Sequence, residues 1–167
     1  WRDGRHEATI AEALGVAFPS LSITCSHELA PVFREFERCS TTVVNAYLAP
    51  VMAAYLGRLR DAVMPARLSV ESSAGGLLTA DEAARSPAHT ALSGPAGGVQ
   101  GAWAVGQRAG RDRLLTLDMG GTSTDVSLLL GALRADDEGA VADQPICLPL
   151  LPIETVGAGG GSVAWVD

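Results

Sequence analysis

The sequence predicts an α/β domain, and three observations carry that prediction. Apolar residues recur at three- and four-residue spacing between 44 and 62, as on one face of a helix. Two apolar runs, 114–117 and 126–130, flank a polar segment, which is typical of a strand, a loop and a second strand. Glycines cluster at 75–76, 94–101, 120–121 and 157–161, with apolar segments between them. A flexible linker would lack those apolar segments. We therefore expect a rigid scaffold whose glycine-containing loops come together around a common point.

Composition narrows the class of protein. The 167 residues are 47% hydrophobic with a net charge of −7, and the 12 Lys and Arg residues form no basic stripe, which argues against nucleic acid as a partner. No apolar run approaches the ~20 residues of a membrane span and no signal peptide opens the chain, so we predict no membrane contact. Cys25, Cys39 and Cys147 form no CxxC pair, which favours a reducing, cytoplasmic compartment and three buried thiols.

The first half of the chain is expected to be mostly helical. Residues 1–26 are a weakly patterned lead-in, with a short helix at 6–14 stopped by Gly15 and a short strand at 21–23. A long helix should begin at Ser40 or Thr41, with Thr41 or Thr42 as its N-cap, and Pro50 should kink it or fray its first part. The apolar face of this helix would hold Val44, Leu48, Val51, Tyr55, Leu59 and Ala62.

Short elements separated by glycine loops follow. A strand at 67–71 should end at the loop 72–76, and Thr79 with Glu82 forms a capping box for a brief helix ended by Pro87. Pro95 opens a helix that Gly110 closes. The segment 93–98, SGPAGG, could place a helix N-terminus against an anion, but we favour close packing through small residues. Prolines then punctuate an extended stretch that ends at Thr155.

The most informative segment is 114–130, LLTLDMGGTSTDVSLLL, which predicts a hairpin with an unusually polar turn. Its glycines permit close approach of a ligand, and its hydroxyls beside backbone N–H groups resemble a phosphate nest. Pairing of the strands would bring two carboxylates to one end, where a hard cation such as Mg²⁺ would balance them. A plain turn is the alternative, since the same residue types are common in turns. The residues concerned are Asp118, Gly120, Gly121, Thr122, Ser123, Thr124 and Asp125.

A second glycine loop, GAGGGS, occupies residues 157–162 and is the last motif of the sequence. It resembles a dinucleotide motif only superficially, because Ser162 stands where a third glycine is needed. We interpret it as a backbone approach to a nucleotide, with the N–H groups of a following helix start aimed at it. A strand-to-helix turn without ligand is equally compatible.

Histidines and tryptophans offer little chemistry. His6, His27 and His89 have no recognisable Ser or Cys partner, so we expect surface or hydrogen-bonded side chains. Trp103 and Trp165 are expected in the core.

Four segments together resemble one family: DMGGTSTD, SGPAGG, ERCSTTVVNAYLAPVM and TVGAGGGSVAWVD. Over roughly residues 27–167 the chain resembles the hydantoinase A/5-oxoprolinase family, which includes N-methylhydantoinases and acetone carboxylase β-type subunits. The resemblance implies an actin/Hsp70/sugar-kinase-like (ribonuclease H-like) ATPase subdomain, a mixed β-sheet with flanking helices. Residues 1–167 would be a single partial domain, the central part of that ATPase-like domain. Since no methionine precedes Trp1, we expect the chain to begin inside a larger protein or after processing.

The resemblance also implies a function and a site. The parent protein would use ATP and Mg²⁺ to open a cyclic amide, hydantoin or 5-oxoproline, by phosphorylating its carbonyl oxygen. The loop 118–125 would cradle the β- and γ-phosphates, with Asp118 and Asp125 at the metal and Asp118 as the catalytic group. The nucleotide's adenosine side would meet Gly157, Gly159, Gly160, Gly161 and Ser162.

The sequence also differs from the family pattern at several places, and the resemblance implies partner chains. The family's first phosphate loop, of the type DxGGTFTD, is absent from these residues, so we expect the chain alone to be inactive. It would act with the rest of a parent chain and a second large subunit. Ala74 replaces a usual asparagine and Glu154 a usual histidine, which leaves the substrate open. The alternatives are a nucleotide-binding or assembly module without turnover, an acetone carboxylase-type subunit, or a sugar or acetate kinase relative.

Overall fold

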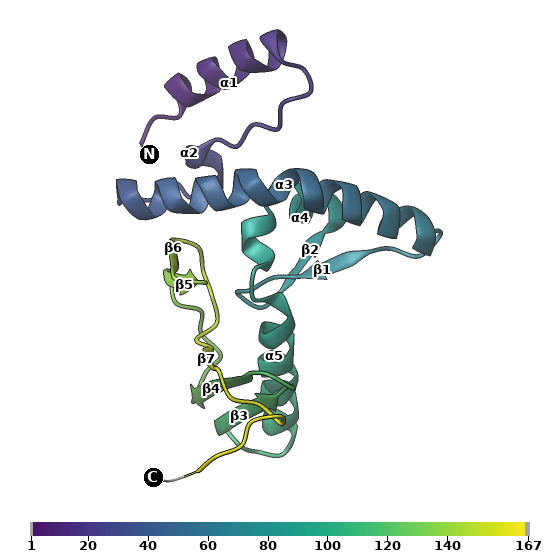
Figure 1. Ribbon diagram of the computed structural model, residues 1–167, viewed down its shortest axis with the longest axis vertical. Coiled ribbons are helices and arrows are strands. Elements are labelled where there is room, and N and C mark those ends of the chain that lie inside the picture. The colour runs from purple at the N-terminus through teal and green to yellow at the C-terminus, as the bar shows by residue number, and fades with distance from the viewer. Residues whose placement is uncertain (1, 166–167) are drawn as a thin grey trace.

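One long helix organises the computed structural model, which describes residues 2–165. Helix α3 (Glu35–Val63) crosses the molecule, with α1 (Arg5–Ala17) and α2 (Ser26–Leu29) on one side of it and the remaining elements on the other (Figure 1). The further elements are β1 (Ser69–Glu71), β2 (Leu77–Thr79), α4 (Ala80–Arg85), η1 (Pro87–Thr90), α5 (Ser93–Arg108), β3 (Arg113–Met119), β4 (Thr124–Leu130), β5 (Gly139–Val141), β6 (Gln144–Ile146) and β7 (Glu154–Val156). From α3 the chain runs through α5 to β3 and β4, returns to α3 at β6, and then places β7 beside β4 (Figure 1).

The strands form three small sheets rather than one. The largest has the order β3-β4-β7, and the pairs β1-β2 and β5-β6 stand alone. All pairings between the named strands are antiparallel. The predicted hairpin and the strand before the loop 72–76 are therefore present, whereas β5 and β6 interrupt the stretch expected to be simply extended.

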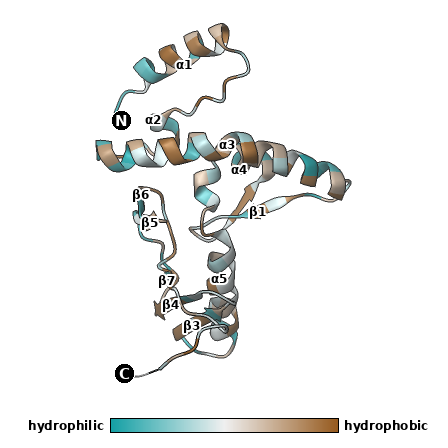
Figure 2. Cartoon of the chain, in the orientation of Figure 1, coloured by the Kyte–Doolittle hydropathy of each residue, from teal (hydrophilic) through white to brown (hydrophobic). Residues whose placement is uncertain are grey.

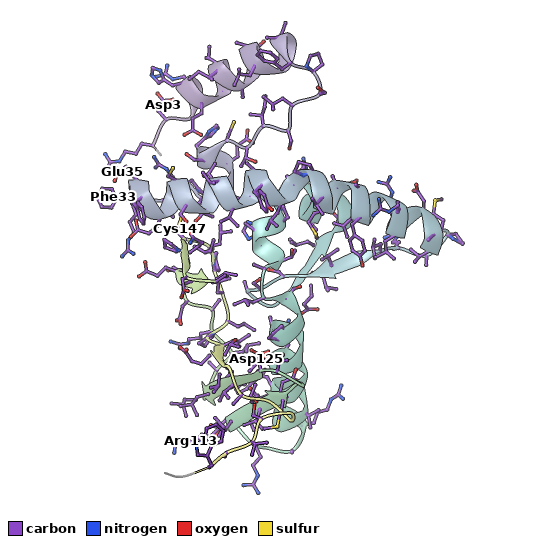
Figure 3. All side chains as sticks on the ribbon, in the orientation of Figure 1. Asp3, Phe33, Glu35, Arg113, Asp125 and Cys147 are labelled. Atoms are coloured by element: carbon purple, nitrogen blue, oxygen red, sulfur yellow. The ribbon has the colours of Figure 1, made fainter. Side chains whose placement is uncertain are left out.

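Helix α3 begins earlier than its apolar pattern indicated and buries a different face. Thr41 is not an N-cap: its fully buried hydroxyl donates to the carbonyl of Glu37 at 2.7 Å and accepts the N–H of Cys147 at 2.9 Å (Figure 3). The helix passes through Pro50 without fraying its first part. Its buried residues are Thr41, Asn45, Ala49 and Leu56, whereas Val51 and Tyr55, expected in the core, are 68% and 50% exposed.

Hydrogen bonding explains why a polar residue occupies the buried face. The Asn45 amide donates to the Thr24 hydroxyl and the Arg85 carbonyl, and its oxygen accepts the N–H of Ala88. A buried amide whose groups are all bonded costs little, so the polar face can point inward. Apolar periodicity alone could not identify such a face.

Length and composition make α3 long and apolar enough to cross a membrane, although no apolar run of about 20 residues was evident in the sequence. An 18-residue window of α3 has a mean hydropathy of 1.2. The sequence shows no continuous apolar run there because alanine and uncharged polar residues separate the strongly apolar ones. Core helices of soluble proteins pass the same test, and α3 packs against α4, η1 and β6. The criterion is therefore weak evidence for a membrane span.

The apolar interior is divided into two clusters. One joins α2, η1 and the segment around β6, and the other joins α5 to the β3–β4 hairpin, with Trp103 packed against it as predicted. Other core predictions are wrong: Trp165 is 78% exposed, Cys39 is exposed, and Cys25 is half-buried. Cys39 lies on an uncovered face of α3, and Trp165 follows the last strand as an exposed side chain.

The N-terminal elements are the least covered part of the fold. Helix α1 continues past Gly15 to Ala17 and has no buried residue, and residues 21–23 form no strand in the structure. Apolar residues lie along α1 and on β3 and β4 (Figure 2). The accessible surface is 10969 Å², whereas a compact monomer of this mass exposes about 7,800 Å². The chain therefore presents much apolar surface that a compact domain would bury.

Candidate functional site

The β3–β4 hairpin places the two predicted carboxylates opposite each other. Residues 113–119 pair with 124–130, and Asp118 lies directly across from Asp125. Side chains of directly opposed residues point to the same face of a sheet, so the aspartates share a face with the pairs Leu114–Leu129 and Thr116–Ser127. Helix α5 packs on that face. The predicted arrangement of two carboxylates at one end of a hairpin is thus confirmed.

The turn of the hairpin is tight and leaves hydroxyls available. The N–H of Gly120 donates to the carbonyl of Ser123 at 2.9 Å, which closes the turn. The buried Thr124 hydroxyl donates to the carbonyl of Ala158 at 2.6 Å and is therefore committed to the second glycine loop. The hydroxyls of Thr122 and Ser123 make no hydrogen bond within residues 2–165, so they remain free for a ligand.

The second glycine loop, 157–162, docks onto this turn through backbone contacts. The N–H of Gly160 donates to the carbonyl of Gly120 at 2.9 Å, and that of Gly161 to the carbonyl of Gly121 at 3.1 Å. A Cβ on Gly159 would lie 2.6 Å from the Gly120 carbonyl oxygen, closer than real Cβ atoms approach. Glycine is required at 159 because the two loops are in backbone contact, which only a residue without a side chain allows.

This docking changes how the second loop can act. Gly160 and Gly161 use their N–H groups on the first loop, and the N–H of Gly159 donates to the Ser162 hydroxyl at 3.0 Å. Strand β7 precedes the loop as a nucleotide loop requires, but no helix follows it among the described residues up to 165. The expected helix start would therefore lie beyond residue 165 and stays a prediction. The nucleotide-holding role of residues 157–162 stays a prediction.

The two carboxylates differ in their surroundings. Asp125 accepts a hydrogen bond from the Thr155 hydroxyl of β7 at 2.6 Å (Figure 3). Asp118 is exposed and has no hydrogen-bond partner within the described chain; one of its oxygens lies 4.0 Å from where a Cβ on Gly98 of α5 would stand. Asp118 is thus the open carboxylate of the pair, and Asp125 is the oriented one. Sequence reasoning missed Thr155, whose only signal was a hydroxyl residue in an extended stretch.

A small cavity lies against these groups. It has a volume of about 280 Å³ and lies between α5 and the hairpin, lined by Pro95, Gly98, Thr116, Asp118 and Asp125 among others. Carboxylate and hydroxyl oxygens are the ligands that Mg²⁺ prefers, and Mg²⁺ usually keeps several waters, so two carboxylates suffice. The opposed carboxylates of Asp118 and Asp125 therefore fit this ion by ligand type.

The loop 72–76 holds the start of α5 in place through hydrogen bonds of Ser73. Ser73 is fully buried: its N–H donates to the His89 carbonyl, its hydroxyl accepts the N–H of Leu92 at the start of α5, and its carbonyl accepts the N–H of Leu151. Ala74 lies in the turn itself, where its N–H donates to the Ser72 hydroxyl at 3.2 Å. The loop positions α5, as expected of a segment without titrating groups. The SGPAGG segment lies beside Asp118 at Gly98, and Pro95 and Gly98 line the cavity. The same segment packs against the hairpin through Ala96.

Known proteins are similar to this chain in sequence and in fold. A hydantoinase/oxoprolinase family model matches residues 38–167. Caprolactamase subunit alpha of Pseudomonas jessenii is 36% identical over 99% of this chain, and 5-oxoprolinase 1 of Arabidopsis thaliana is 38% identical over 95% of it. The chain spans 25% and 13% of the length of these relatives, respectively.

Solved structures agree with the sequence matches. The ATP-dependent caprolactamase from Pseudomonas jessenii superposes with a TM-score of 0.78 at 36% identity, covering 99% of this chain and 25% of that one. Nucleotide-free acetone carboxylase, from a study of ATP-dependent acetone carboxylation, superposes with a TM-score of 0.76 at 29% identity, covering 93% of this chain and 22% of that one. These matches confirm the predicted α/β, actin-like ATPase fold class. The chain belongs to the hydantoinase/oxoprolinase family.

Proposed function

We propose that this chain is the phosphate-binding part of an ATP-dependent cyclic-amide hydrolase. The observation that carries the proposal is the docking of two glycine loops beside a pair of opposed carboxylates, Asp118 and Asp125. Relatives named caprolactamase and 5-oxoprolinase are named for cyclic amides, which supports this substrate class. Because the chain spans a quarter of the first of these relatives, turnover is proposed for the protein that carries it.

The residues present suit phosphoryl transfer, which depends mainly on positioning and charge neutralisation. ATP, when bound with Mg²⁺, would supply the phosphoryl group that activates the amide carbonyl. Asp118, open and unpartnered among the described residues, would hold a metal-bound water or orient the attacking oxygen. Asp125 is fixed by Thr155 and would hold the cation. The free hydroxyls of Thr122 and Ser123 would donate to phosphate oxygens.

A partner completes the proposed enzyme. The subunit designations of the caprolactamase and acetone carboxylase relatives support a multi-subunit assembly. The chain would therefore work with the rest of a parent polypeptide and a second large subunit, in the cytoplasm. We expect the 167 residues alone to bind nucleotide without turnover, because they carry one of the two phosphate loops that clamp ATP.

A second function, an assembly module without chemistry, is favoured by one specific observation. The outer face of the hairpin exposes Leu115, Leu117 and Leu128 to between 57% and 68%, which suits a surface that another part of the assembly covers. This exposure is compatible with either function, since an enzyme subunit also needs covered faces. Similarity to the acetone carboxylase beta subunit supports a variant of the first function, in which the chain is part of an ATP-dependent carboxylase.

Substrate-dependent ATP hydrolysis tests the proposal. The protein that carries this chain, with its partner subunit, is assayed for ATP hydrolysis with hydantoin, 5-oxoproline, caprolactam and acetone. We expect one cyclic amide to stimulate hydrolysis, and Asp118→Asn to lower kcat by about 10²-fold or more. Asp137→Asn, on an exposed loop, is the matched control and should leave kcat unchanged. If neither a cyclic amide nor acetone stimulates hydrolysis, the assembly module is the better description.

A further inference from the structure

A mixed set of metal-ligating side chains lies at the opposite end of the molecule from the hairpin. Glu7 of α1, Cys25 just before α2 and His27 of α2 each offer one ligand atom, and these three atoms lie within 4.8 Å of one another. All three residues are half-buried. We propose that these residues bind one zinc ion, which fastens α1 to α2.

The chemistry of the ligands selects zinc among common ions. Thiolate, imidazole and carboxylate are the three ligand types of protein zinc sites, whereas Mg²⁺ and Ca²⁺ prefer oxygen alone. A thiolate from Cys25 and a carboxylate from Glu7 carry two negative charges, which balance the ion, and the neutral imidazole of His27 adds none. Binding releases the thiol proton of Cys25, so the charge is balanced only in the metal-bound form.

The distances suit a tetrahedral ion after small side-chain movements. Ligand bonds of about 2.0–2.3 Å place neighbouring ligand atoms of a tetrahedral site roughly 3.3–3.8 Å apart. The Nδ1 atom of His27 is already 3.3 Å from a carboxylate oxygen of Glu7. The Cys25 thiol has no hydrogen-bond partner within residues 2–165, so no existing interaction opposes its rotation toward the other two.

The surroundings hold the ligands in place. The Ser26 hydroxyl donates to one oxygen of Glu7 at 2.7 Å, which leaves the other oxygen directed at His27. The Nε2 atom of His27 lies 4.0 Å from a carboxylate oxygen of Glu28, close to the second-shell arrangement that orients zinc-bound histidines. A side chain on Gly4 would overlap the His27 ring, so glycine at that position gives the ring its place.

An ion can reach Cys25 from a neighbouring cavity, and water would fill the fourth position of a tetrahedral ion that these three residues hold. Cys25 and Glu28 line a cavity of about 710 Å³ between the segment 20–25 and the helices α3 and α4. Hydrogen bonds alone explain the contact between Glu7 and His27, but they give no role to the thiol of Cys25. The metal accounts for all three groups.

Zinc binding would have a structural consequence for α1. This helix has no buried residue, and its contact with α2 runs through Glu7. Joining Glu7 to Cys25 and His27 through an ion closes a loop of the chain and limits the motion of α1. The proposal is independent of the proposed phosphate site, because β3 and β4, which carry that site, lie at the other end of the molecule from α1 (Figure 1).

Cobalt titration of the 167-residue chain tests the proposal directly. Co²⁺ occupies zinc sites and gives a near-ultraviolet charge-transfer band only when a thiolate binds it, so ions at the carboxylates of the hairpin are invisible in this assay. We expect a band that saturates at one equivalent and disappears when Zn²⁺ is added. Cys25→Ser should abolish the band, and Cys39→Ser, which removes a thiol elsewhere, should retain it. Glu7→Gln should weaken Co²⁺ binding at least tenfold.

Hydrogen exchange supplies the second readout. Zn²⁺ should slow exchange of the α1 amides in the unsubstituted chain and in Cys39→Ser, but not in Cys25→Ser. Circular dichroism shows whether each variant is folded. Absence of the band in the folded, unsubstituted chain overturns the proposal whatever the variants do, and so does a band that survives Cys25→Ser undiminished.

Discussion

Replacing Gly159 by alanine should separate the two glycine loops of the site. A Cβ at this position would stand 2.6 Å from the Gly120 oxygen and 2.7 Å from backbone atoms of Gly121 and Thr122. These are backbone atoms in a closed turn, so no side-chain rotation relieves the overlap. The loops must therefore move apart.

The size of the effect follows from the contacts that hold the loops together. Three hydrogen bonds cross between them, from Gly160, Gly161 and the Thr124 hydroxyl. At about 1 kcal/mol each, their loss lowers the free energy of unfolding by about 3 kcal/mol. Overpacking a tight site costs a similar amount, about 1–3 kcal/mol.

Urea unfolding and Mg-ATP calorimetry measure the two consequences. Gly157→Ala is the matched control, because a Cβ there meets nothing within 4 Å. We expect Gly159→Ala to lose about 3 kcal/mol of stability and more than tenfold in affinity for Mg-ATP, while Gly157→Ala leaves the stability unchanged. Equal behaviour of the two variants would refute the reasoning that loop docking shapes the site.

Three further predictions concern the supporting fold. Asn45→Ala leaves the buried N–H of Ala88 without its acceptor and should lower the free energy of unfolding in urea by about 2–4 kcal/mol. Thr79→Ala removes the capping box with Glu82 and should cost about 1 kcal/mol in the same assay, whereas a change under 0.3 kcal/mol would mean that the cap contributes nothing. Burial lowers the pKa of His89 below its ordinary 6.5, so the unfolded chain binds a proton more readily and stability should fall as pH drops below 6.5. His89→Gln should reduce this dependence between pH 6.5 and 5; an unchanged profile would assign it to other groups.

The hairpin could be predicted because its information is local. Two apolar runs indicate the strands, and the polar turn between them fixes which residues face each other, including Asp118 and Asp125. The capping box at Thr79 was predictable for the same reason, since its two side chains lie within one helical turn.

Features that depend on distant residues could not be predicted. The burial of Thr41 and Asn45 rests on partners as far away as Cys147, which no periodicity reveals. The docking of residues 159–161 onto the hairpin turn and the bond from Thr155 to Asp125 likewise join segments that the sequence separates. Trp165 was misplaced because hydrophobicity indicates a core only where some element covers the residue.

Calorimetric titration of this chain with Mg-ATP tests the central claim most directly, that the docked glycine loops and the paired aspartates bind the phosphates of a metal–nucleotide complex. The account predicts saturable heat that disappears with EDTA and an affinity at least tenfold lower for Asp118→Asn, with Asp137→Asn unchanged. Absence of heat from the folded chain, or equal affinity in Asp118→Asn and the unsubstituted chain, would contradict it.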